Sequence, residues 1–175
     1  MSARRNMRTS KKSTCNSKDL SYKNIRLEPD SQSHRLDVIV FRGNPIDSPC
    51  CRHAGLLIEK MSHEGTMMQR RFLHVTGAAG FFLREEDIDR DPTKSEFFAG
   101  SVPVATIPAS GPSDSRLRDA IWFTAINNAE MGWNCHNWVG DALYACTQAG
   151  LVSKDKTEKA IEGMTDLIVQ ARDVV

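Results

Sequence analysis

The sequence lacks long apolar segments and internal repeats. No run approaches the roughly 18–20 apolar residues needed to span a bilayer, and the N-terminus has no apolar stretch typical of a secretory signal. Hydrophobic residues make up 40% of the 175 residues and charged residues 26%, which is ordinary for a globular protein. We therefore expect a cytoplasmic protein without a membrane span.

Cysteines are few and odd in number. Five in a chain without a secretory signal favour reduced thiols over a disulfide framework. A zinc site built from Cys50, Cys51, His53 and Cys135 is one alternative. However, adjacent cysteines rarely both bind one metal in the common ligand spacings. The sequence therefore predicts no metal and no other cofactor.

The charges divide the chain into two parts. Residues 1–33 carry eight Lys or Arg against three acidic residues, whereas the whole chain has a formal net charge of +1. We predict a disordered basic tail over 1–33 and a single mildly acidic domain over 34–175. Nucleic-acid binding by the tail is only weakly indicated, because Tyr22 is its single aromatic residue.

Apolar periodicity predicts a sheet followed by helices. β-branched and aromatic runs predict strands over 36–42, 53–59, 71–76, 81–85 and 102–107. Pro103 suggests that the last of these is an edge strand or has an irregular start. Three- and four-residue spacing predicts helices over 117–125, 135–149 and 160–171. The expected fold class is α+β, with an antiparallel sheet packed against helices.

Cys135 is the residue most suited to chemistry. It opens the helix predicted over 135–149, where unpaired backbone N–H groups and the helix dipole favour a thiolate. Asn134 is a natural N-cap, and the same N–H groups could hold an oxyanion. Alternatively, Cys135 is simply the first apolar position of a core stripe that also contains Cys146.

A cysteine nucleophile needs an imidazole base and an orienting group. We expect His34 and His63 to be solvated, and His136 points away from its neighbour Cys135. If the turn is centred on residues 64–65, His53 lies opposite residue 76, with His74 as its diagonal neighbour on the same face. A register slip of one residue would place the two histidines on opposite faces of the sheet. Alternatively, His53 opens a strand at a solvated edge and His74 is a hydrogen-bonded histidine of the sheet.

These motifs resemble a known group of enzymes. The strand His53-Ala-Gly-Leu-Leu-Ile-Glu59, a histidine on the next strand, and Asn134-Cys-His-Asn-Trp-Val139 opening a helix occur with histidine before cysteine. This resembles the circularly permuted papain-like thiol enzymes, which include NlpC-type peptidases and lecithin:retinol acyltransferases, and also small uncharacterised fungal proteins. The resemblance covers about residues 36–150. It implies a permuted papain-like fold.

The resemblance also implies roles for the candidate residues. Cys135 would be the nucleophile, His53 the base and His74 the orienting residue, with backbone N–H groups near Cys135 as the oxyanion hole. We assign Asn134, Trp138 and Gly55 to substrate binding. Gly55 leaves room beside His53 that a helix carrying Cys135 could fill.

The expected function is that of a cysteine hydrolase or an acyl or peptidyl transferase. Its partner would be a small-molecule, acyl or peptide substrate with an amide, ester or thioester bond, and loops 61–69 and 85–100 would shape the pocket. No hydrophobic anchor follows the predicted catalytic helix, which argues against a lipid substrate. The alternative is an inactive ligand- or protein-binding module of the same fold. The sequence does not indicate an oligomeric state.

Overall fold

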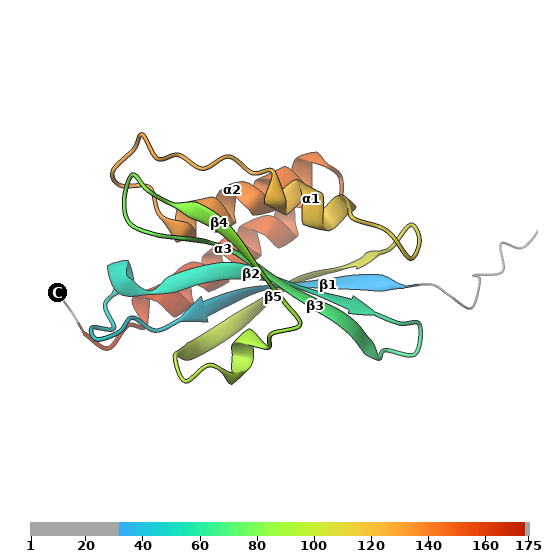
Figure 1. The fold of residues 1–175 in the computed structure, drawn as a ribbon, viewed down its shortest axis with the longest axis horizontal. Coiled ribbons are helices and arrows are strands. Elements are labelled where there is room, and N and C mark those ends of the chain that lie inside the picture. Colours follow the sequence, from blue (N-terminus) through green and yellow to red (C-terminus); the bar gives the residue numbers. More distant parts are fainter. Residues whose placement is uncertain (1–31, 174–175) are drawn as a thin grey trace, which may run out of the picture.

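One antiparallel sheet runs through the molecule in the order β4-β3-β2-β1-β5 (Figure 1). In this computed structural model, which describes residues 32–173, its strands are β1 (Ser33–Phe41), β2 (His53–Met61), β3 (Met67–Thr76), β4 (Leu83–Ile88) and β5 (Phe98–Pro108). The α+β class is as predicted. Because β5 is an edge strand with a register irregularity at Pro103, that prediction is also confirmed.

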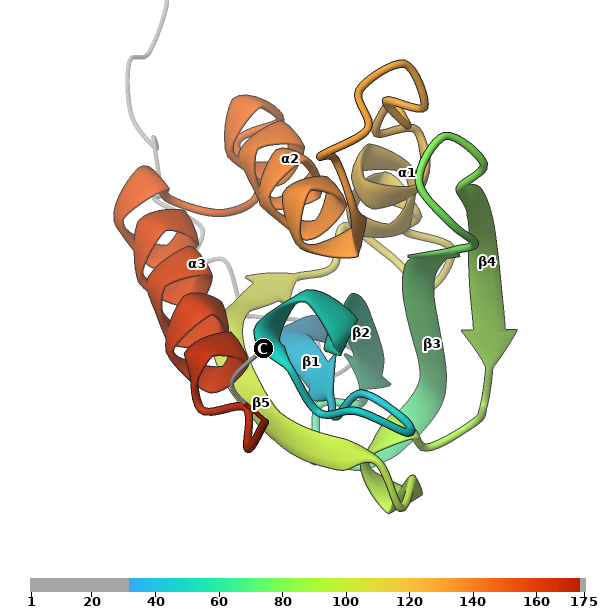
Figure 2. The same cartoon turned by 90° about the vertical axis from the view of Figure 1, so that its left-hand side faces the viewer.

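Three helices cover one face of the sheet (Figure 2). They are α1 (Arg116–Trp122), α2 (Cys135–Gln148) and α3 (Lys154–Val169). Alternate residues of β2 point toward them, and these share a large apolar core with α2: Ala54, Leu56 and Ile58 with Trp138, Val139, Ala142, Leu143 and Cys146. Among the described residues, no helix is long and apolar enough to cross a membrane.

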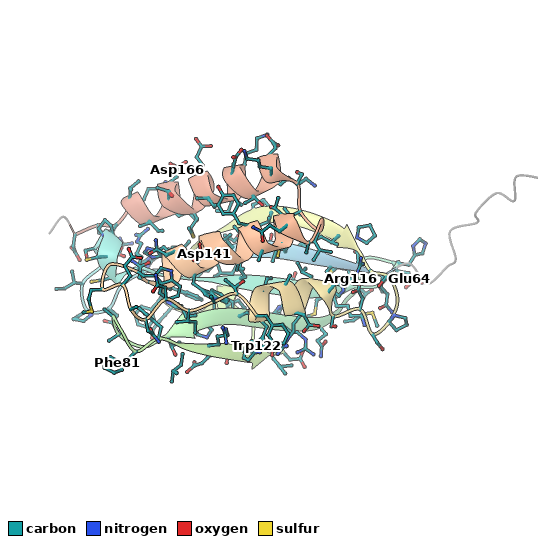
Figure 3. The ribbon with its side chains drawn as sticks, turned by 90° about the horizontal axis from the view of Figure 1, so that it is seen from above. Glu64, Phe81, Arg116, Trp122, Asp141 and Asp166 are labelled. Carbon is teal, nitrogen blue, oxygen red and sulfur yellow. The ribbon has the colours of Figure 1, made fainter. Side chains whose placement is uncertain are left out.

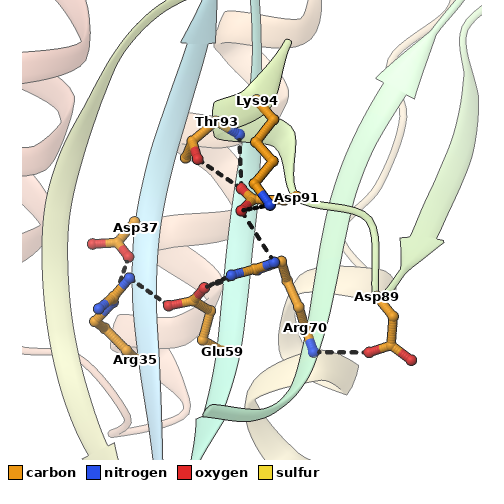
Figure 4. A network of polar contacts seen from close by, with 8 residues as sticks. All are labelled: Arg35, Asp37, Glu59, Arg70, Asp89, Asp91, Thr93 and Lys94. Atoms are coloured by element: carbon orange, nitrogen blue, oxygen red, sulfur yellow. Dashed lines mark hydrogen bonds and ion pairs between the residues drawn. The ribbon is translucent and has the colours of Figure 1, made fainter. Parts of the chain in front are cut away.

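The other face of the sheet is covered by the connection from β4 to β5. These strands occupy opposite edges, so residues 89–97 must cross the whole face. Beneath this crossing segment, Glu59 is buried and paired with Arg35 and Arg70, and Arg70 Nη1 lies 3.3 Å from the Asp91 carboxylate (Figure 4). The ion pairs satisfy the buried charge of Glu59 and tie the crossing segment to the sheet.

Several predicted boundaries were wrong. β1 begins at Ser33, so the predicted tail overlaps the sheet, and the rest of the tail lies outside the described residues apart from residue 32. β3 begins at Met67 rather than 71, and β4 covers Leu83–Ile88 rather than 81–85. β5 starts at Phe98, α1 ends at Trp122, and α3 starts six residues early at Lys154. His34, expected to be solvated, is only 7% exposed.

Candidate active site

Cys135 is the first residue of α2, as predicted. The Asn134 side chain accepts a hydrogen bond from the backbone N–H of His136 at 2.8 Å, and the Asn137 side chain accepts one from the Asn134 N–H at 3.0 Å. This reciprocal capping box fixes where the helix starts. It therefore makes Cys135 the first residue of the helix, and the Cys135 sulfur lies near Arg52, the residue before β2.

The Cys135 sulfur is enclosed rather than solvated. The residue is 8% exposed, and Sγ lies 4.0 Å from the Arg52 carbonyl oxygen. Burial raises the pKa of the Cys135 thiol, although the backbone N–H groups of Ala54, Cys135 and His136 act in the opposite direction. Desolvation thus outweighs the helix terminus, and the resting sulfur is a neutral thiol.

His53 and His74 form a hydrogen-bonded pair. His53 Nε2 lies 2.9 Å from His74 Nδ1, and the β2–β3 register pairs Gly55 with His74. That register is the one expected from a turn at residues 64–65, so the predicted same-face arrangement is confirmed. The pair lies on the face of the sheet that the crossing segment covers, with the ring of Phe41 stacked on His53.

Glu85 favours one direction of the hydrogen bond between the two imidazoles. It is the cross-strand partner of His74, and its Oε2 lies 3.8 Å from His74 Nε2, which has no hydrogen-bond partner among the described residues. A proton on His74 Nε2 is favoured by that carboxylate. His74 Nδ1 is then the acceptor, His53 Nε2 the donor, and His53 Nδ1 keeps a free lone pair.

Burial keeps both imidazoles neutral. It lowers the pKa of His53 to about 4, assisted by the nearby rings of His74 and His136. It also lowers the pKa of His74, against the carboxylates of Asp87 and Glu85. At neutral pH the pocket that these residues line therefore holds a neutral thiol and two neutral imidazoles.

His136 and Arg52 connect the helix to the strand, and sequence reasoning missed both. His136 Nε2 donates to the Arg52 carbonyl at 2.8 Å, directly before His53. The Arg52 guanidinium is buried against Asp47, with two contacts of 2.8 Å, and donates to backbone carbonyls at the end of α3. An arginine before a histidine carries no local signal of this role, because its partners lie far along the chain.

The three predicted catalytic residues line one pocket of about 520 Å³ at the end of the sheet where β2 begins. Asn134 lines it as well, together with Trp133, Phe82 and residues 75–79, which form the end of β3 and the start of the connection to β4. Figure 3 places Phe81 in the β3–β4 connection at one end of the molecule and Glu64 at the other. The 61–69 loop is therefore remote from this pocket, contrary to expectation.

Two of the residues predicted to bind substrate, Trp138 and Gly55, do not line this pocket. Trp138 is fully buried in the core of the helix face and does not line the pocket. Gly55 does not line it either. A Cβ at Gly55 would come within 2.5 Å of the Phe72 ring and 2.8 Å of the His74 Cβ, so Phe72 rather than a helix occupies the expected space.

A second pocket lies on the opposite side of the histidine pair. It measures about 320 Å³ and lies between the sheet and the crossing segment. Phe41, Phe72 and Pro92 give it apolar walls, while Asp87 and Arg90 add charge. Because His53 and His74 line both pockets, the pair can be approached from two sides. The predicted 85–100 loop contributes to this second pocket.

No metal centre accompanies these groups. Across residues 32–173, no three His, Cys, Asp or Glu side chains are placed to hold a metal ion. Cys50 and Cys51 line the mouth of the pocket without forming such a cluster. Cys146 is buried in the core, which raises its pKa to about 12, in agreement with a structural role.

Comparison with known proteins identifies no relative. No family model matches the chain. No curated protein and no solved structure matches it either.

Proposed function

We propose that this protein is a cysteine hydrolase or acyl or peptidyl transferase with a permuted papain-like arrangement, in which Cys135 attacks an amide, ester or thioester. One observation carries the proposal: a cysteine at a capped helix start lines the same pocket as a hydrogen-bonded pair of buried histidines. A nucleophile, a base and an orienting group are the parts that thiol acyl transfer requires.

The proposed reaction uses His53 Nδ1 as the base. As the sulfur attacks the substrate carbonyl, the thiol proton passes to His53 Nδ1. The hydrogen bond from His53 Nε2 to His74 stabilises the resulting imidazolium, with Glu85 beyond it. The backbone N–H of Cys135 receives the carbonyl oxygen as it becomes negative. The imidazolium then gives its proton to the leaving group, and water or a second acceptor releases the acyl thioester.

The neutral resting state favours concerted transfer over a preformed ion pair. Burial raises the pKa of Cys135 and lowers that of His53 to about 4, so a resting thiolate–imidazolium pair is disfavoured. Attack and proton transfer must then occur together when substrate fills the pocket. A consequence is slow reaction with small alkylating reagents but efficient reaction with bound acyl donors.

The test uses a variant that lacks Cys50 and Cys51, the exposed thiols among residues 32–173. In Cys50→Ser/Cys51→Ser, treatment with p-nitrophenyl acetate should place an acetyl group on Cys135, detected by peptide mass spectrometry. His53→Gln should slow acetylation at least about a hundredfold through loss of the base, and Cys135→Ser should abolish it. Acetylation of Cys146 at an equal rate, or no effect of His53→Gln, would contradict the proposal.

A ligand-binding module is the second candidate. The raised pKa of Cys135 and the lowered pKa of His53 favour this candidate too, because a non-catalytic pocket would also contain an unreactive, neutral thiol. In that case a panel of nitrophenyl esters, thioesters and peptide amides would leave no acyl adduct. Cys135→Ser would then bind ligands as well as the unmodified chain does.

A further inference from the structure

Two adjacent thiols stand at the mouth of the pocket and take no part in the proposed reaction. Cys50 and Cys51 belong to a short 3-10 turn, Pro49–Cys51, that leads directly into β2. Both are exposed, and their sulfur atoms are 3.9 Å apart. The other two described cysteines, Cys135 and Cys146, are buried.

The surroundings of Cys50 favour its thiolate. The Ser48 hydroxyl oxygen lies 3.1 Å from Cys50 Sγ. This contact, followed by that with Cys51, holds the pKa of the Cys50 thiol below its ordinary value. Exposed thiols of lowered pKa beside a second thiol are the ones that peroxides oxidise most readily. By exposure and by charge, Cys50 should react before the enclosed Cys135.

We propose that Cys50 and Cys51 are a peroxide-reactive dithiol that closes reversibly to a disulfide. The Cys50 thiolate sulfur attacks one oxygen of hydrogen peroxide; the O–O bond breaks, and a sulfenic acid and hydroxide form. The Cys51 sulfur then attacks the Cys50 sulfur, the S–O bond breaks, and water leaves. Overall, two thiols lose two electrons and two protons, and one peroxide becomes two water molecules.

The backbone around the turn makes this disulfide easy to reduce. Adjacent Cα atoms are about 3.8 Å apart, closer than the roughly 4.4–6.8 Å usual for disulfides. The turn has little freedom to adapt, because Cys51 and Arg52 N–H groups both donate to the Ser48 carbonyl. The Cys51 Cβ also lies against Gly43, where an added Cβ would come within 2.7 Å. Strained and exposed disulfides are the labile ones.

The test measures the thiols directly and does not depend on the proposed function. The reduced full-length chain is treated with an equimolar amount of hydrogen peroxide, free thiols are blocked, and peptides are mapped by mass spectrometry. The expected product is a Cys50–Cys51 disulfide that glutathione reduces. Ser48→Ala should slow its formation about threefold or more by raising the thiol pKa, whereas Cys146→Ser should leave the rate unchanged.

Other oxidation products would overturn the proposal. Sulfinic acid on Cys50 without a disulfide would show that Cys51 does not resolve the sulfenic acid. A disulfide from Cys50 to Cys135, to Cys15 or to a second chain would show that another thiol is the partner. Equal peroxide rates for Cys50→Ser and the unmodified chain would show that Cys50 is not the reacting thiol.

Discussion

The buried ion pair between Asp47 and Arg52 gives a quantitative test of how the site is held. Arg52 Nε and Nη2 each lie 2.8 Å from an Asp47 oxygen, and the two side chains are 5% and 9% exposed. Asp47 also accepts from the backbone N–H of Gly43 at 3.2 Å. Asp47→Asn removes the negative charge at nearly constant volume, leaving the Arg52 guanidinium buried without a counter-charge.

The expected cost of Asp47→Asn is about 3–5 kcal/mol of unfolding free energy, the usual result of breaking one side of a buried pair. For a chain of this size that corresponds to a melting temperature lower by roughly 6–20 °C. Urea unfolding followed by tryptophan fluorescence measures it. The matched control is Asp155→Asn, whose partner Lys159 lies 3.1 Å away in a pair that is 72% exposed on both sides. For Asp155→Asn we expect the unfolding free energy to change by less than about 0.5 kcal/mol.

The unfolding free energy of the same variant should also depend on pH. Hydrogen bonds from Arg52 hold the pKa of Asp47 well below its ordinary value. A depressed carboxyl pKa stabilises the fold above the unfolded pKa of about 3.9 and ceases to do so as the pH falls toward the folded value. Asp47→Asn should therefore lose less stability than the unmodified chain below about pH 4. A cost at pH 7 no larger than that of Asp155→Asn would refute the reasoning.

Three further variants test particular contacts. Gly55→Ala should destabilise the chain by about 1–3 kcal/mol in thermal unfolding, because its Cβ meets the Phe72 ring; Gly140→Ala, whose Cβ meets nothing closer than 4.0 Å, should not. Asn134→Ala should cost about 1 kcal/mol of urea stability through the lost cap, and Asn134→Asp, which keeps an acceptor, should cost less. As the pH is lowered from about 6.5 to 4, the unfolding free energy should decrease. His53 in the unfolded chain takes up a proton over this range, whereas folded His53, with a pKa of about 4, does not. His53→Gln should make the unfolding free energy less dependent on pH over this range. An unchanged slope would show that another group causes the pH dependence.

Two features of the site could be predicted from local sequence patterns: the register between β2 and β3, and the residue at which α2 begins. Strand alternation and a turn at residues 64–65 were sufficient for the register that brings His53 and His74 together, because register fixes which side chains share a face. The Asn134 cap and the apolar spacing after it were sufficient for the start of α2. Both features follow from residues that are close in sequence or joined by one short turn.

The errors arose where distant partners decide the outcome. β3 extends back to Met67 because Arg70 is paired with Glu59 on the neighbouring strand, and an arginine in isolation does not indicate a strand. α3 starts at Lys154 because Ser153 caps a polar first turn that lacks apolar spacing. Gly55 was predicted to leave room for a helix, but a strand pattern cannot show that the Phe72 ring of the neighbouring strand occupies that room.

The candidate site depends on where β2 begins. Along β2, Ala54 points toward α2 while His53 points toward the crossing segment, so a cysteine on α2 and the histidine pair belong to opposite faces of the sheet. They line a common pocket only because His53 is the first residue of the strand and Cys135 the first residue of the helix. If the histidine or the cysteine stood two residues further along its strand or helix, the sheet would separate the sulfur from the imidazole. The hydrogen bond from His136 to the Arg52 carbonyl joins the first turn of α2 to the residue before β2. The alignment of Cys135 with His53 therefore depends on this contact.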